Sequence, residues 1–214
     1  GGTGAVTFEH VKQAVENVVS EADIAANGLR ASLVLLKGVP ETVLSLTDGT
    51  AFNNVRDALR GLLYPVLKPS APASALRHVR ENVLVAGAGY RGGRAVVVVL
   101  TDGSSQEPLS EVEREADLLR GLGHRVVVVG FPEFGSTDLD LVQLAPFALY
   151  GGNVFALERL LVAGDNSGVE DFLLNVLCEG AAPGSSVIAL LSSASAVVRA
   201  VSSMPVPSAS LSPS

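Results

Sequence analysis

Cysteine and aromatic residues are scarce in this chain of 214 residues. It has one cysteine, no tryptophan, and an aromatic content of 5%. Because apolar residues still reach 48%, we expect a core built mainly from Val, Leu and Ala. The single thiol, Cys178, excludes a disulfide within the chain. It is either a small buried apolar residue or half of a disulfide to a cysteine outside this sequence.

Positive charge is also in short supply. Lys and Arg number 15 against 22 Asp and Glu, which gives a net charge of −7. Nucleic-acid-binding domains present a basic face, so this balance argues against nucleic acid as a partner. The acidic balance is compatible with binding a cation.

The sequence lacks a long apolar run. The most apolar late stretch, Val187 to Val201, is too short and too rich in serine to cross a bilayer, and Arg199 interrupts it. We therefore expect no membrane insertion. No secretory signal is recognised at the start, so a secreted protein would carry its signal upstream of Gly1.

Catalytic motifs are absent as well. There is no G-x-S-x-G segment, and the histidines at 10, 78 and 124 show no metal-binding spacing. A G-x-G-x-x-G segment spans Gly87 to Gly92, but Gly93 and Arg94 lead directly into an apolar run rather than a helix. Dinucleotide binding needs a helix there, so an oxidoreductase is only a remote alternative. We expect no enzyme.

What the chain does contain is an alternation of strand and helix patterns. Continuous β-branched runs predict strands that are covered on both faces, as in a parallel sheet. Strands are predicted at 31–36, 41–47, 95–100, 125–131 and 153–157. Helices are predicted near 8–25, 52–62, 76–83, 138–144 and 167–178, and another from a capping box at Ser110 and Glu113. This order predicts a doubly wound α/β domain.

Two features orient this sheet. Strands 31–36 and 41–47 are too close for a parallel crossover, so they should form an antiparallel hairpin at a sheet edge. Asp102 follows the buried strand AVVVVL in the segment Thr101-Asp102-Gly103. Ligands of such sheets bind beyond the carboxyl ends of the strands. Asp102 is therefore either a ligand for a hard cation or part of an Asp-Gly turn.

The segment VVVVLTDGSSQE, followed by a helix and then GHRVVVVGF, resembles a von Willebrand factor A (VWA) domain. The segments FEHVKQAVENVV and ALRHVRENVL are similar to the A-type modules of collagen VI α chains and related matrix proteins. The resemblance covers about residues 5–180. It implies a Rossmann-like, mostly parallel sheet with one antiparallel edge strand, and a protein-interaction or adhesion role.

The resemblance also implies a metal-ion-dependent adhesion site. Asp102 matches the aspartate at the end of the LTDG-type strand, and Ser70 in KPSAPASAL is the nearest equivalent of the family's threonine. The DxSxS motif of that site is absent, since Gly1 to Ala5 repeats only its rhythm. We therefore expect a degenerate site formed by Asp102 and Ser70. Mg²⁺ binding is expected only if a DxSxS motif precedes Gly1.

The family's apolar first strand is missing before Gly1, which predicts an incomplete sheet and marginal stability. Residues 1–180 are expected to form the VWA-like domain. Residues 181–214, rich in Ser, Pro and Ala, are expected to be a mostly disordered tail or linker.

The expected function is a non-enzymatic adhesion module of a secreted, extracellular matrix protein. Its expected partners are extracellular matrix proteins or collagen, and neighbouring VWA modules of the same chain. An intracellular VWA scaffold domain in a multiprotein assembly is the alternative.

Overall fold

The computed structural model describes residues 3–22, 24–25, 27–62, 70–101, 105, 107–130, 154–156, 167–180 and 185–192. These residues form a six-stranded sheet with the order β2-β1-β6-β3-β4-β5. All neighbours are parallel except β1 and β2. The strands are β1 (Arg30–Leu36), β2 (Glu41–Leu44), β3 (Ala95–Thr101), β4 (Arg125–Gly130), β5 (Val154–Ala156) and β6 (Ser186–Ser192).

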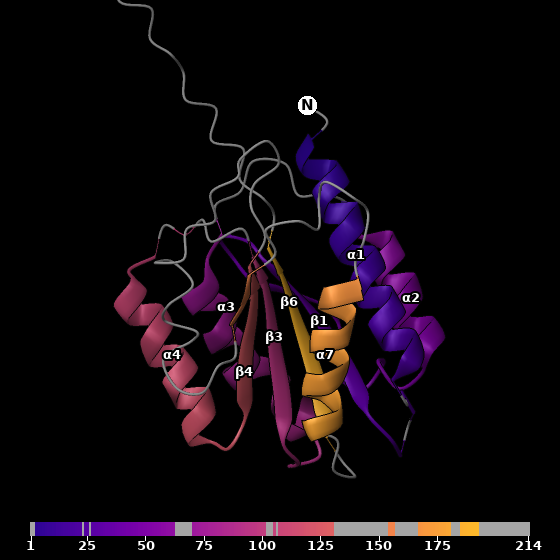
Figure 1. Cartoon of the computed structure of the whole chain (residues 1–214). Coiled ribbons are helices and arrows are strands. Elements are labelled where there is room, and N and C mark those ends of the chain that lie inside the picture. The colour runs from indigo at the N-terminus through magenta and orange to yellow at the C-terminus, as the bar shows by residue number, and fades with distance from the viewer. Residues whose placement is uncertain are drawn as a thin grey trace, which may run out of the picture.

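Helices cover both faces of the sheet (Figure 1). One face carries α1 (Thr3–Glu21), α2 (Phe52–Gly61) and α7 (Ser167–Gly180). The other face carries α3 (Pro72–His78), its π-helical continuation η1 (Val79–Val83) and α4 (Leu109–Gly121). The predicted α/β class, with a mostly parallel sheet and helices on both sides, is confirmed.

The predicted hairpin is also confirmed. β2 pairs antiparallel with β1, for example Leu33 with Leu44, and lies at the edge of the sheet. The two strands are joined by four residues, Lys37 to Pro40. A parallel crossover would need a dozen residues or more, so chain length alone dictates this antiparallel edge.

The β-branched runs lie where both faces are covered. Every residue of β3 is buried, and so are residues 126–130 of β4. Val96, Val98 and Leu100 pack with α1, α2 and α7, whereas Ala95, Val97 and Val99 pack with α3 and α4. Alternate side chains of one strand thus enter two separate cores.

Two expectations about the C-terminal segment are wrong. Residues 186–192, expected to lie in a disordered tail, form β6 between β1 and β3. The position expected to be empty for want of a first strand is therefore filled, and the domain extends past residue 180. The reason is that Val187 to Leu191 form an uninterrupted apolar run, which the sheet buries on both faces. Residues 193–214 lie outside the described residues.

Two further expectations concern the helices. The capping box at Ser110 is wrong, because α4 begins at Leu109 with Pro108 at the N-cap and no side-chain cap. The expected helix at 138–144 lies outside the described residues. Among the described helices, none is both long enough and apolar enough to cross a membrane.

Candidate functional site

The carboxyl ends of the parallel strands form one edge of the sheet, and two hydroxyl residues are buried there. Thr101 is the last residue of β3 and is 3% exposed. Ser70 precedes α3 and is 2% exposed. Asp102, the expected metal ligand that follows Thr101, lies outside the described residues.

Glu107 joins the two segments that carry these residues. Its carboxylate accepts hydrogen bonds from the backbone amides of Ala73 (2.6 Å) and Ser74 (3.1 Å), and from the Ser74 hydroxyl. The amides belong to the first turn of α3, where backbone N–H groups lack partners within the helix. The loop after β3 is thereby fastened to the start of α3, two residues beyond Ser70.

The described residues of this edge do not fit a divalent cation. Mg²⁺ requires about six oxygen ligands, usually with carboxylates among them. Ser70 and Thr101 offer neutral hydroxyls, and the Glu107 carboxylate is already bound to the N-terminus of α3. Within the described part of the chain, no group of three or more His, Cys, Asp or Glu side chains could hold a metal ion.

The glycine-rich segment has a structural role instead of the nucleotide-binding one. Ala86–Ala88 form a short 3₁₀ turn, and residues 91–94 then lead into β3, not into a helix. Gly89 has φ +91°, and a Cβ there would lie 2.6 Å from the backbone nitrogen of Thr47. Close packing against the segment after β2 therefore requires glycine at this position.

His78 and His124, the two histidines whose side chains the structure describes, do not form a common site. His78 in α3 is hydrogen-bonded to the Thr42 hydroxyl at 2.7 Å. His124 precedes β4, and its Nδ1 accepts a hydrogen bond from the amide of Ala95 at 3.3 Å. Burial lowers the pKa of both imidazoles. Each neutral ring therefore serves as a local structural contact. His10 lies on α1, and its side chain is outside the described set.

A buried charge cluster between α3 and α4 was not predicted. Glu115 is 2% exposed. It accepts hydrogen bonds from Arg77 Nε (3.0 Å), Arg80 Nη2 (3.0 Å) and Arg114 Nη2 (3.2 Å). Burial alone would raise the pKa of Glu115, but the hydrogen bonds from Arg77 and Arg80 outweigh it and hold the pKa below its usual value. The cluster fastens α3 to α4.

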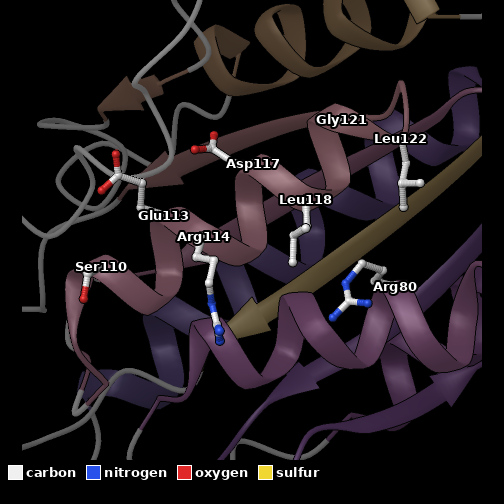
Figure 2. Close-up of a pocket in the computed structure, with 8 residues that line it drawn as sticks. All are labelled: Arg80, Ser110, Glu113, Arg114, Asp117, Leu118, Gly121 and Leu122. Atoms are coloured by element: carbon white, nitrogen blue, oxygen red, sulfur yellow. The ribbon is translucent and has the colours of Figure 1, made fainter.

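A shallow groove of about 690 Å³ runs along α4 beside this cluster. Figure 2 shows Arg114 and Leu118 extending from α4 toward the helix that carries Arg80. Leu118 and Leu122 are 44% and 62% exposed. The remaining lining residues are charged or small, namely Ser110, Glu113, Asp117 and Gly121. The groove therefore lacks the enclosure and the polar constellation of a small-molecule site.

The sheet has one antiparallel edge strand, and helices cover both of its faces. This strand order and these features agree with the fold that the resemblance to a VWA domain implied. The profile of the von Willebrand factor type A domain matches residues 1–160. The chain belongs to this family. This confirms the resemblance that the segments around β3 and β4 indicated.

Relatives of this VWA domain include collagen and matrix proteins. The collagen alpha-4(VI) chain of Mus musculus is 29% identical over 178 residues, which cover 82% of this chain. Matrilin-1 of Homo sapiens is 24% identical over 142 residues, or 66% of this chain. The chain spans 7% of the length of the collagen relative and 28% of matrilin-1.

Solved structures share the fold. Proximal thread matrix protein 1 from the mussel byssus superposes with a TM-score of 0.67 at 17% identity, covering 80% of this chain and 43% of that one. The manganese-loaded TRAP protein of Plasmodium vivax gives a TM-score of 0.62 at 11% identity, covering 80% and 68%. Another structure of the byssus protein has zinc in its MIDAS motif.

Proposed function

We propose that this VWA domain is a non-enzymatic interaction module of an extracellular matrix protein. The observation that carries the proposal is the similarity to collagen alpha-4(VI) over 82% of the chain. The matrilin-1 relatives and the byssus matrix protein point the same way. Within the described residues, no group of three or more His, Cys, Asp or Glu side chains could hold a catalytic metal ion.

The contact surface in this proposal is the edge at the carboxyl ends of β3, β4 and β6. Doubly wound sheets bind their ligands at this edge. Asp102 follows β3 there and supplies a negative charge for a basic partner. The hydroxyls of Ser70 and Thr101 are buried beneath, so their role is to shape the edge rather than to contact a protein.

Cation binding at this edge is a separate question from the binding of a protein partner. Relatives of the fold hold zinc or manganese, but the described residues here supply hydroxyls and one carboxylate that is already occupied. We propose that Asp102 and Ser70 form a degenerate site. The partner is then bound through protein contacts without a strongly held Mg²⁺.

A solid-phase assay with the full chain tests this proposal. Immobilised collagen VI, fibrillar collagen and matrilin-1 serve as probes, in Mg²⁺ and in EDTA. We expect saturable binding to at least one probe, equal in both buffers. Asp102→Ala should weaken it about tenfold, which corresponds to about 1.4 kcal/mol. Asp117→Ala is the matched control, because it removes the same charge from an exposed position on α4.

Three results would contradict the proposal. Absence of saturable binding to all probes would remove the interaction role. Equal binding by Asp102→Ala and the unmodified chain would place the contact surface elsewhere. Binding that is lost in EDTA would show that a metal is essential and that the site is not degenerate.

A further inference from the structure

β6 has an unusual combination of positions. It follows every other described element in sequence, yet it lies in the middle of the sheet. It pairs in parallel with β1 from Arg30 to Leu36 and with β3 from Ala95 to Leu100. Without β6, the β1–β2 pair and the β3–β4–β5 group would share no ladder of backbone hydrogen bonds. Among the described elements, the two halves of the sheet are therefore joined by the strand that comes last in the sequence.

The strand order shows which strand β6 replaces. When β6 is counted first, the order becomes 3-2-1-4-5-6, which is the order of a doubly wound sheet. In that order the first strand leads into the first helix. β6 therefore occupies the place of a strand that would precede α1.

The sequence after β6 supports this equivalence. Ser192-Ser193-Ala194-Ser195-Ala196-Val197 has four small residues followed by Ala-Val. Gly1-Gly2-Thr3-Gly4-Ala5-Val6, from which α1 begins, has the same order. The chain thus repeats, after β6, the pattern found at the start of α1. β6 is therefore followed by the kind of sequence that leads into the first helix of this domain, as expected of a first strand.

The space between β1 and β3, hereafter the acceptor slot, recognises this strand in two ways. Backbone groups of β1 and β3 pair with it on both sides, irrespective of sequence. Its side chains then fit alternately. Val187, Ala189 and Leu191 enter the core under α1, α2 and α7. Ile188 and Leu190, both 0% exposed, enter the core under α3 and α4.

We propose that the acceptor slot is a strand-binding site that takes β6 from a second copy of this chain as well as its own. The second copy's β6 has the same residues, so it would make the same ladder and fill the same two cores. Exchange of an identical element is an accessible route to dimers. Only five residues, 181–185, separate α7 from β6, and short connections of this kind favour exchange.

Two proline variants of the full chain test the proposal by complementation. Ala189→Pro disables β6 as a donor, because proline cannot pair in a central strand, but leaves the slot residues intact. Val98→Pro disables the slot in the same way but leaves β6 intact. Each variant alone should lose its native helical circular dichroism. Refolded together in equal amounts, they should regain about half of the unmodified signal and form a heterodimer.

A matched mixture provides the control. Ala189→Pro is refolded with a chain that carries both prolines and has no intact β6 to donate, and no signal should return. If the first mixture also regains nothing, the slot accepts only its own strand and the proposal is wrong. It is equally wrong if Ala189→Pro alone keeps the native signal, because the slot then needs no strand. The readout requires no matrix partner, so it is independent of the proposed function.

Discussion

At the scale of single residues, the sequence identified candidates by their place on the strands but could not supply their surroundings. Ser70 is buried just before α3, and Thr101 is buried at the end of β3. Asp102 lies outside the described residues, so metal ligation by Asp102 and Ser70 stays a prediction. Glu115 was missed, although its position between Val112 and Ala116 puts a carboxylate within the apolar stripe of α4. A charge in such a stripe signals a buried ionic partner.

Replacing Glu115 tests the cluster. Glu115→Gln removes the charge that three arginines hold, and hydrogen bonds to charged groups contribute about 1.5–3 kcal/mol each. Because Arg77 and Arg114 are partly exposed and can be solvated, we expect a loss of about 2 kcal/mol in the free energy of unfolding at pH 7. Urea denaturation measures it. Glu113→Gln makes the same charge change two residues earlier on α4, at a position that lines the groove, and should lose less than about 0.5 kcal/mol.

The difference in stability between the unmodified chain and Glu115→Gln should also depend on pH, in a direction that the pKa of Glu115 determines. The pKa of Glu115 is lower in the folded chain than its ordinary value of 4.5. Its contribution is therefore fully present above the unfolded pKa and is lost as the pH falls through the folded pKa. The gap in stability between the unmodified chain and Glu115→Gln should shrink below about pH 4.5. A gap that is constant down to pH 2 would contradict the ion-pair account.

At the scale of elements, periodicity and β-branched runs predicted β1 to β5 and most of the helices. β6 was assigned to a tail because Ser, Pro and Ala surround it on both sides. Its own residues, Val187 to Leu191, resemble those of β3. The pairing that makes β6 a strand involves β1 and β3, which lie about 90 residues or more earlier in the sequence. Local sequence patterns cannot reveal such long-range pairing.

Shortening one side chain of β6 tests whether residues 186–192 form a core strand or belong to a tail. Ile188 is 0% exposed, and Ile→Ala in a core costs about 2–5 kcal/mol. We expect Ile188→Ala to lower the free energy of unfolding by that amount in chemical denaturation. Val39→Ala, at a position that is 79% exposed, is the control and should change it by less than about 0.5 kcal/mol. Equal losses in the free energy of unfolding for the two variants would indicate that residues 186–192 belong to a tail and not to the core.

At the scale of the whole molecule, the fold class and the family were both accessible from the sequence. The order of several segments, rather than one motif, carried the resemblance to VWA domains, and the family profile confirms it over residues 1–160. The extent of the folded part was not accessible. The extent of the folded part depends on whether β6 pairs between β1 and β3, and this pairing is a property of the complete sheet. With β6 in place, the described residues form two cores on either side of one continuous sheet.

Hydrogen–deuterium exchange of the unmodified chain, followed by mass spectrometry, tests this account most directly. Amides in a central strand exchange only through large-scale opening, whereas those of a disordered tail exchange at the rate of a free peptide. We expect peptides covering 187–191 to be protected as strongly as those covering 96–100 of β3. Exchange of 187–191 at the free-peptide rate, with 96–100 still protected, would contradict it.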